Sequence, residues 1–323
     1  MSQSVLRVLF CSAGRRAGLV ERFRAAAERL DVGLEILACD MIPEQSAACL
    51  LADKSFRVPR CNDAGYPDSV LSIVREHGVD LVVPTIDPEL LPLSRAAEDF
   101  AALGARLHVS PESVIEVVRD KLRTSEVLAA AGVPVPDSAD HAALLANPEA
   151  LGWPVFAKPG GGSSSRGLQV FQRIEEVPER FPEPMVFQKL LQGDEYTVNM
   201  FVDASGALRT VVPHMRVQVR AGEVEKGRTV RRDDLHQIAE GIVRALPELR
   251  GVACFQVLDD PALGPRVIEI NARFGGGYPL ADEAGATFAQ WLLEEVSGRI
   301  CGAHDDWRPG VWMVRYDSAV YQG

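Results

Sequence analysis

The stretch of residues 267–277 constrains the fold of this chain more than any other. It reads Val-Ile-Glu-Ile-Asn-Ala-Arg-Phe and ends in three glycines. Alternate side chains of an extended strand share a face, so we expect Glu269, Asn271 and Arg273 to project together while their apolar neighbours pack behind them. A solvated strand could carry these residues by chance, but a carboxylate, an amide and a guanidinium in register before three glycines favour a binding surface.

The chemistry that suits this surface is a metal-assisted phosphate site. Carboxylate and amide oxygens are hard ligands for Mg²⁺, which proteins hold with few side chains plus substrate phosphates. Arg273 has a planar fork that binds phosphoryl oxygens. An apolar run at 252–258 precedes the strand, with a turn-rich segment at 259–265 between them. The two runs predict a hairpin that places Gln256 across from Glu269 as a third oxygen donor.

A loop rich in glycine and serine follows another candidate strand. Residues 154–159 are apolar except for Lys158, and residues 160–167 read Gly-Gly-Gly-Ser-Ser-Ser-Arg-Gly. Glycine lets backbone approach an anion closely, and successive amides can form an anion-binding nest. The alternative is a flexible linker, but linkers do not usually join a strand carrying a lysine to another strand, here 168–171. The loop lacks the Gly-Lys-Ser/Thr ending of a Walker A motif, so we interpret it as a mobile lid over phosphates.

A third pattern runs from residue 185 to residue 198. An apolar strand, Met-Val-Phe-Gln-Lys, leads through a Gly-Asp turn into a second strand that opens on Glu195. By itself this pattern predicts another hairpin. A carboxylate at Glu195 could accept hydrogen bonds from ribose hydroxyls, as acidic residues do in other nucleotide sites.

In this order the three pieces resemble the ATP-grasp superfamily, most closely the ATP-grasp unit of the carbamoyl-phosphate synthase large chain and the small ligases similar to it. The resemblance reaches from about residue 110 to residue 290 and includes Asp120-Lys121 and the run Leu-Ala-Ala-Ala-Gly-Val-Pro-Val-Pro at 128–136. It implies that Lys158 and the lid bind phosphates and that Glu195 binds ribose. It also implies that Arg273 stabilises the transferred phosphoryl group.

The resemblance implies two sets of ligand-binding residues. The metal ligands are Gln256, Glu269 and Asn271. The nucleotide-binding residues are Lys121, Lys158, Gly161, Gly162, Ser163, Ser164, Ser165, Gln188, Lys189, Leu190, Glu195, Gln256 and Glu269. Gln188, Lys189 and Leu190 would form the adenine-binding hinge. Gln188 departs from the family, whose hinge commonly has an acidic residue there, so its amide oxygen must be oriented toward the adenine amino group.

Composition narrows the class of protein. A chain of 323 residues with 47% hydrophobic content can bury a large core and is expected to form two or three subdomains. It has neither a long apolar run nor an N-terminal signal pattern, which predicts a cytoplasmic protein without a membrane span. Six cysteines without a C-x-x-C pair are expected to be small buried hydrophobes. The net charge of −11 argues against nucleic acid as the main partner.

The first hundred residues alternate strands and helices, which implies a parallel sheet with crossover helices. The expected strands are 5–11, 35–39 and 81–84, and the expected helices are 17–30, 69–76 and 88–103. Residues 12–16 lie at the carboxyl end of the first strand, where open α/β sheets bind ligands. They do not complete Gly-x-Gly-x-x-Gly, so NAD is not expected. Asp40 fits the role of a ribose-binding acid and the role of a turn residue equally well.

The resemblance implies that this first region lends residues to the substrate site, and residues 85–89 are the best candidates. Residues 211–220 alternate so that His214 and Arg216 share a face near the phosphates, if the family arrangement holds. Arg216 and Lys226 are candidates for binding the substrate carboxylate or the γ-phosphate, whereas His214 suits a structural role equally well. A helix is expected over 234–246, and a strand over 311–316 is expected to close a sheet.

These inferences combine into one hypothesis. The fold class is α/β and α+β: an N-terminal preATP-grasp parallel-sheet domain at 1–110, an ATP-grasp small lobe at 111–192 and a large lobe at 193–323. The function is an ATP-dependent ligase that joins a small carboxylate to an amine or thiol through an acyl phosphate. ATP and Mg²⁺, replaceable by Mn²⁺, are the expected cofactors, and a homo-oligomer is compatible with the sequence. The catalytic residues are Arg273, Lys158 and Arg216.

Four alternatives differ in their sequence features. A carbamoyl-phosphate synthase resembles two such units in one chain, and a single unit is present here. Biotin carboxylase usually continues into a further C-terminal domain. A nucleotide sensor without turnover would have little use for Glu269, Asn271 and Arg273 together. An NAD-dependent oxidoreductase would bind its cofactor through the N-terminal half alone.

Overall fold

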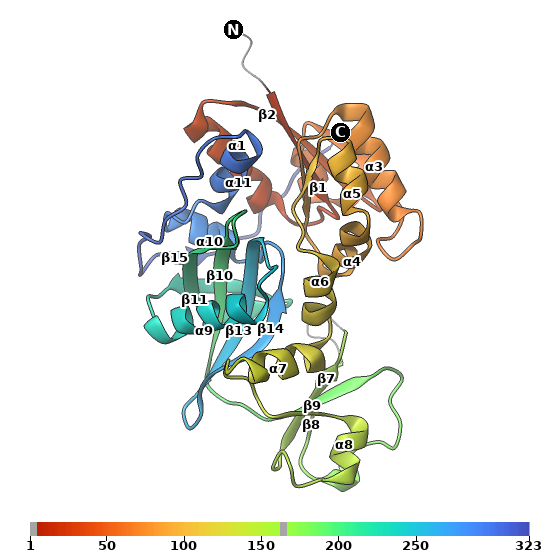
Figure 1. Cartoon of the computed structure of the whole chain (residues 1–323), viewed down its shortest axis with the longest axis vertical. Coiled ribbons are helices and arrows are strands. Elements are labelled where there is room, and N and C mark those ends of the chain that lie inside the picture. Colours follow the sequence, from red (N-terminus) through yellow and green to blue (C-terminus); the bar gives the residue numbers. More distant parts are fainter. Residues whose placement is uncertain (1–4, 162–166, 323) are drawn as a thin grey trace.

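The computed structural model describes residues 5–161 and 167–322. In those residues the strands form three sheets, arranged along the long axis of the molecule (Figure 1). Four of the expected lid residues, Gly162, Ser163, Ser164 and Ser165, lie outside the described residues. Gly161 is described.

The N-terminal sheet is parallel and has the strand order β3-β2-β1-β4-β5. Its strands are β1 (Val5–Cys11), β2 (Gly33–Asp40), β3 (Lys54–Arg57), β4 (Leu81–Pro84) and β5 (Arg106–Leu107). Its helices are α1 (Ala17–Leu30), α2 (Ala47–Leu51), α3 (Tyr66–His77), α4 (Asp87–Arg95) and α5 (Ala97–Ala102). The predicted parallel sheet is confirmed. The helix expected over 88–103 is divided, because the Ala96 N–H closes a tight turn onto the Leu93 carbonyl.

The small sheet is antiparallel and has the order β6-β9-β7-β8. It consists of β6 (Ser138–Asp140), β7 (Val155–Pro159), β8 (Gln169–Phe171) and β9 (Met185–Lys189), with α8 (His141–Ala146) packed on it. This unit lies at the bottom of Figure 1, away from the N-terminal sheet. It carries Lys158 on β7.

The large sheet has the order β14-β13-β10-β11-β12-β15. Its strands are β10 (Asp194–Val202), β11 (Leu208–Arg220), β12 (Glu223–Thr229), β13 (Gly251–Asp260), β14 (Gly264–Asn271) and β15 (Trp312–Val314). The expected hairpin of residues 252–273 is present as β13 and β14. The expected last strand is also present and pairs with β12 at the sheet edge.

The hairpin predicted over 185–198 is wrong. β9 belongs to the small sheet and β10 to the large one, and both edges of each strand are already paired within its own sheet. The intervening segment is held at the end of β13, where the Gln192 N–H donates to Asp260 Oδ2 at 3.0 Å. Gly193 has a φ of +115° and lies against the Asp259 carbonyl, leaving no room for a side chain. The segment therefore connects two sheets.

Helices cover both faces of the large sheet. On one face pack α6 (Glu112–Arg119), α7 (Lys121–Ala130) and α9 (Asp233–Ala245), the last as expected over 234–246. On the other face lie α10 (Tyr278–Glu283) and α11 (Phe288–Val296). These two helices share their core with β1 and α1, where Phe23 meets both Phe10 and Phe274 edge-on. The N-terminal sheet is thus joined to the large sheet through a shared core that includes α1, α10 and α11.

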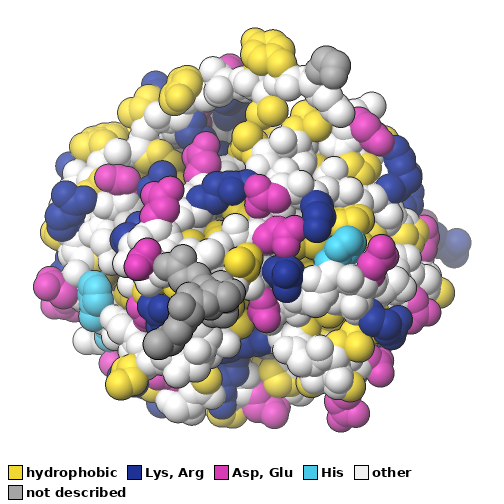
Figure 2. Space-filling view, turned by 90° about the horizontal axis from the view of Figure 1, so that it is seen from above, with side chains coloured by type: hydrophobic (Ala, Val, Ile, Leu, Met, Phe, Trp, Pro, Cys, Tyr) yellow, Lys and Arg dark blue, Asp and Glu magenta, His cyan; other side chains and the backbone are white. Residues whose placement is uncertain are grey.

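The surface mixes charges of both signs. On the face shown in Figure 2, acidic and basic side chains are interspersed among apolar ones. No helix in the described part of the chain has the length and apolar character needed to cross a bilayer.

Candidate functional site

A cavity of about 300 Å³ lies where the N-terminal sheet meets the large sheet. Its walls come from the loops after β1 and β4, the hairpin of β13 and β14, the turn between β11 and β12, and the glycines after β14. Its charged and amide lining residues are Arg15, Arg16, Asp87, Glu195, Arg216, Glu223, Gln256, Glu269, Asn271 and Arg273. The volume suits a small-molecule site.

The hairpin brings the expected metal ligands together. Gln256 on β13 is directly paired with Glu269 on β14, and a register irregularity follows Gln256. Asn271 Nδ2 donates to Glu269 Oε1 at 2.7 Å, and Arg273 Nη2 donates to Asn271 Oδ1 at 3.1 Å. β14 itself ends at Asn271, so Arg273, which was expected within the strand, lies two residues beyond its end. All four side chains line the same cavity.

Arg273 is held by the N-terminal domain. Its Nη2 lies 2.5 Å from Asp87 Oδ2, and both side chains are nearly buried. Burial opposes the charge of Arg273, but the Asp87 carboxylate outweighs it and raises the pKa of the guanidinium above its usual value. Residues 85–89 were expected to reach the site, and Asp87 among them does so. The buried Arg273 Nε has no hydrogen-bond partner among the described residues, so it remains a donor for a ligand oxygen.

Two lysines approach Glu269 from other elements. Lys158 extends from β7 to the large sheet, where its Nζ donates to the Ile268 carbonyl at 2.9 Å. Burial lowers the pKa of Lys158 to about 8, partly opposed by the Glu269 carboxylate. The Nζ of Lys121 lies 3.5 Å from the Gly160 carbonyl oxygen. Its pKa is also lowered by burial and raised by Glu269.

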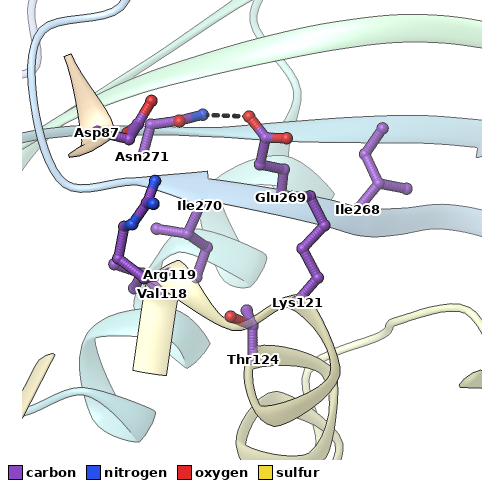
Figure 3. Close-up of a pocket in the computed structure, with 9 residues that line it drawn as sticks. All are labelled: Asp87, Val118, Arg119, Lys121, Thr124, Ile268, Glu269, Ile270 and Asn271. Carbon is purple, nitrogen blue, oxygen red and sulfur yellow. Dashed lines mark hydrogen bonds between the residues drawn. The ribbon is translucent and has the colours of Figure 1, made fainter. Parts of the chain in front are cut away.

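A second, smaller cavity of about 20 Å³ adjoins the hairpin on the side of α6 and α7. Figure 3 shows Asn271 and Glu269 on β14 and Asp87 on α4, with Lys121 and Thr124 facing them from α7. Asp120 caps this helix by accepting from the Leu122 and Arg123 N–H groups at 3.0 and 3.1 Å. Glu269, Asn271 and Asp87 line both cavities, and Lys121 lines the smaller one.

Glu195 and Arg216 form an ion pair in the main cavity. Arg216 Nε lies 3.3 Å from Glu195 Oε1, and Arg216 Nη2 donates to the Gly222 carbonyl at 3.0 Å. Burial raises the pKa of Glu195, partly opposed by Arg216. The structure therefore places the expected ribose-binding acid and the expected third catalytic residue side by side.

The donor set fits a hard divalent cation. One carboxylate and two amide side chains supply oxygens from adjacent positions of a rigid hairpin, and Mg²⁺ normally takes its other ligands from water and phosphates. In the structure the Asn271 oxygen faces Arg273 while its nitrogen faces Glu269. Asn271 would therefore join Glu269 around a cation only after its amide turns over.

Several expected site residues lie elsewhere. The Gln188 side chain is buried and its Nε2 donates to Ser138 Oγ at 2.8 Å. Lys189 and Leu190 line a separate open hollow. Lys226 on β12 is exposed and does not line the main cavity. The hinge residues and Lys226 are thus not gathered with the metal-binding set.

His214 is buried beneath the glycine loop. It does not line the cavity, and a Cβ at Gly277 would come within 2.6 Å of its Nε2. Its Nδ1 lies 3.2 Å from Asn199 Nδ2, and burial lowers the pKa of its imidazole to about 3. Of the two roles left open by the sequence, the structure favours the structural one.

Sequence reasoning missed Glu223. Its carboxylate lies 3.2 Å from Arg16 Nη1 and 2.8 Å from Arg315 Nη1, so it joins the N-terminal loop to the segment after β15. Arg16 also donates to the Thr85 carbonyl at 3.3 Å. A glutamate in a Gly-Glu turn carries no local signal of such partners. Only Arg16 was foreseeable, from its position after β1.

The cysteines give no sign of a metal centre. Cys11, Cys39, Cys49 and Cys254 are buried, whereas Cys61 and Cys301 are partly exposed and only partly fit the expectation of burial. In residues 5–161 and 167–322 no group of three His, Cys, Asp or Glu side chains is arranged to hold a metal ion. Asp40 accepts from the Gly14 N–H at 2.9 Å, which is the structural alternative considered for it.

Comparisons with known proteins agree with this architecture. Residues 8–108 match a family described as PylC-like, N-terminal domain, and residues 118–277 match the ATP-grasp domain. The carbamoyl-phosphate synthase of Methanobrevibacter smithii is 27% identical over 160 residues, covering 46% of this chain and 41% of the relative. A D-alanine--D-alanine ligase of Laribacter hongkongensis is 30% identical over 209 residues, covering 57% of this chain and 67% of the relative.

Solved structures share the fold over almost the whole chain. Biotin carboxylase from Campylobacter jejuni, solved as a complex with β-γ-ATP, superposes with a TM-score of 0.75 at 16% identity. The superposition covers 94% of this chain and 73% of that one. At this identity the likeness concerns the fold alone. The chain spans only 41% of the length of the carbamoyl-phosphate synthase relative.

Proposed function

The chain belongs to the ATP-grasp family, and on that premise we propose that it is an ATP-dependent ligase that joins a small carboxylate to an amine or thiol. The observation that carries the proposal is the row of Glu269, Asn271 and Arg273 facing one cavity opposite Gln256. Such a row supplies both cation ligands and a fixed positive charge for a transferring phosphoryl group. ATP is the proposed phosphoryl donor.

The residues around the row take roles that follow from their positions. Gln256, Glu269 and Asn271 would hold Mg²⁺ or Mn²⁺, which neutralises phosphate charge when bound. Lys158 and Lys121 lie close enough to Glu269 to interact with it electrostatically, so they are placed to bind phosphate oxygens. Glu195 is the proposed ribose contact and Arg216 fixes its carboxylate. Gln188, Lys189 and Leu190 remain the proposed adenine hinge.

The proposed reaction has two steps. A substrate carboxylate oxygen attacks the γ-phosphoryl group, giving an acyl phosphate and ADP while Arg273 stabilises the charge on the phosphoryl oxygens. An amine or thiol then attacks the acyl carbon and inorganic phosphate leaves. Exclusion of water from the cavity protects the intermediate from hydrolysis.

The test is to identify where ATP is cleaved. The protein is incubated with ATP, Mg²⁺, an amine mixture and a panel of small carboxylates and amino acids labelled with ¹⁸O in the carboxylate. We expect ADP rather than AMP, and transfer of ¹⁸O from the active acid into inorganic phosphate. Formation of AMP and pyrophosphate, or amide formation without ¹⁸O in phosphate, would contradict the acyl-phosphate mechanism. A Glu269→Gln variant serves as the inactive control.

A further inference from the structure

The loops after β1 and β4 meet at the main cavity. β1 pairs with β2 on one side and with β4 on the other, so the order of strands reverses between β1 and β4. Open parallel sheets bind ligands beyond the carboxyl ends of the strands at such a reversal. Residues 15–16 after β1, and residues 86–88 at the end of the loop after β4 and the start of α4, line the cavity. The N-terminal sheet therefore has a binding position of its own beside the β13 and β14 hairpin.

The loop after β1 is held in a strained and rigid shape. Ser12 has a φ of +46°, which a residue other than glycine rarely adopts. Its Oγ donates to the buried Glu89 at 2.7 Å. Gly14 donates to Asp40 at 2.9 Å and accepts from Ser46 Oγ at 3.0 Å. Strain of this kind persists where the surroundings enforce it, and it gathers at ligand sites.

Among the described residues four arginines line the cavity, and three of them form ion pairs with cavity-lining carboxylates. Arg16 is paired with Glu223 at 3.2 Å, Arg216 with Glu195 at 3.3 Å and Arg273 with Asp87 at 2.5 Å. Two charged lining residues remain outside these pairs. Glu269 is the proposed cation ligand, which leaves the guanidinium of Arg15.

Arg15 is exposed at the cavity wall. Within the described parts of the chain its side chain makes no hydrogen bond or ion pair. Burial raises the pKa of Glu223, but Arg16 and Arg315 outweigh it and lower that pKa, with a smaller electrostatic contribution from Arg15. The loop fixes the backbone from which the Arg15 side chain extends, and the guanidinium fork suits carboxylate and phosphate oxygens.

We propose that Arg15 binds an anionic group of the acid substrate other than the carboxylate that is phosphorylated. The substrate class is then an acid with a second carboxylate or a phosphate-like group. The proposal rests on the proposed ligase function, because it assigns a substrate subsite in the same cavity. The loop carrying Asp87 neighbours the loop carrying Arg15 and touches Arg273, so the subsite adjoins the place of phosphoryl transfer.

The experiment compares acids of matched length with one or two anionic groups. Butyrate, succinate and 3-phosphonopropionate, and the corresponding acids one and two carbons longer, are tested with the full chain, ATP, Mg²⁺ and the amine mixture. ADP release gives KM and kcat, and calorimetry with a nonhydrolysable ATP analogue gives Kd. Arg15→Gln is compared with wild type and with Arg75→Gln, which changes an exposed arginine of α3 that does not line the cavity.

We expect at least one acid with two anionic groups to bind about tenfold or more tightly than the monoacid of equal length. Arg15→Gln should remove most of that preference, raising KM and Kd about tenfold while leaving kcat and ATP affinity near wild type. Arg75→Gln should change neither. A preference for the phosphonates over the dicarboxylates identifies the second group as phosphate-like, and the reverse identifies it as a carboxylate.

Three results would overturn the proposal. They are equal affinity for monoacids and acids with two anionic groups, wild-type affinity in Arg15→Gln, and a loss in kcat alone. The ligase function fails separately, through AMP formation or absence of ¹⁸O transfer. Dicarboxylate binding that depends on Arg15 could be measured by calorimetry even then, whereas ¹⁸O transfer without any effect of Arg15→Gln would refute this subsite alone.

Discussion

Burial and the partner group together set the pKa of each charged side chain of the site. Lys158 and Arg273 are both buried, yet the pKa of Lys158 is lowered to about 8 while that of Arg273 is raised. The difference lies in the partner, because Lys158 donates to a neutral carbonyl and Arg273 contacts the Asp87 carboxylate. Residue type alone would have given both side chains the same unconditional positive charge.

Glu269→Gln should keep the fold and remove turnover. The change deletes the one carboxylate of the proposed cation set at constant volume, and the amide can still accept from Asn271. We expect ADP release to fall by at least about a hundredfold, equivalent to roughly 2.7 kcal/mol of transition-state stabilisation, with an unchanged melting temperature. Glu179→Gln, on an exposed glutamate, is the matched control. A folded Glu269→Gln protein with wild-type turnover would remove this metal assignment.

ATP affinity should weaken as the pH rises from 7 to 9. The free protein loses the Lys158 proton near pH 8, and phosphate binding favours the protonated form, so above that pH binding must take up a proton. The expected weakening is about tenfold, since one pKa unit corresponds to a factor of ten. Calorimetry of an ATP analogue in buffers of different ionisation enthalpy measures both affinity and proton uptake. Lys158→Arg, which does not titrate in this range, should lose the dependence; a dependence that persists would assign it to another group.

At the scale of elements, the site depends on how strands and helices end. β14 stops at Asn271 and the glycines that follow turn the chain beside His214 and Cys254. Helix α7 begins at Lys121 because Asp120 satisfies two free N–H groups of its first turn. Asp120-Lys121 is one motif in the resemblance to the family, but its two residues have different roles in the structure. Asp120 fixes the helix start from which Lys121 reaches Gly160.

Asp120→Ala should therefore destabilise the protein modestly and weaken nucleotide binding. Loss of an N-cap costs about 1 kcal/mol of unfolding free energy, and a frayed first turn displaces Lys121. Chemical denaturation and ATP-analogue titration measure the two effects. Asp120→Asn keeps a capping oxygen and should retain most of both properties. Equal losses in the Asn and Ala variants would show that the charge of Asp120, rather than its cap, matters.

At the scale of the whole molecule, the main cavity exists because the N-terminal sheet and the large sheet are held together through α1, α10 and α11. The contacts of Phe23 with Phe10 and Phe274 bury the junction, and large apolar side chains of this kind contribute roughly 1.5–3 kcal/mol each when fully buried. The Asp87–Arg273 ion pair crosses the same junction. The boundaries 1–110, 111–192 and 193–323 remain predictions, although α6 and α7 share their core with the large sheet, and α7 also contacts β6 of the small sheet.

Asp87→Ala should strongly destabilise this junction. It leaves the buried Arg273 charge without its carboxylate, and removing one partner of a buried pair typically costs about 3–5 kcal/mol. The double variant Asp87→Ala with Arg273→Met should be more stable than Asp87→Ala alone, because the unpaired cation is gone. Urea denaturation of wild type, both single variants and the double variant gives the coupling free energy. Strictly additive effects would mean that the pair does not couple the two sheets.

The sequence determined those features that follow from local periodicity. A period of two in residues 267–271 puts Glu269 and Asn271 on one face whatever the strand packs against. Alternating strand and helix patterns in the first hundred residues allow few arrangements other than a parallel sheet. The resemblance to the ATP-grasp family also rests on these local patterns, since its motifs are short runs within single elements.

Only the tertiary structure decided which elements meet. β9 and β10 are neighbours in sequence but enter different sheets, because each finds both of its hydrogen-bonding partners elsewhere. The partner of Arg273 is Asp87, 186 positions away, and that of Arg16 is Glu223, 207 positions away. No local pattern encodes such pairs, because a charge is paired by whatever the packed sheets bring beside it. Arg15 was left unpaired for the same reason.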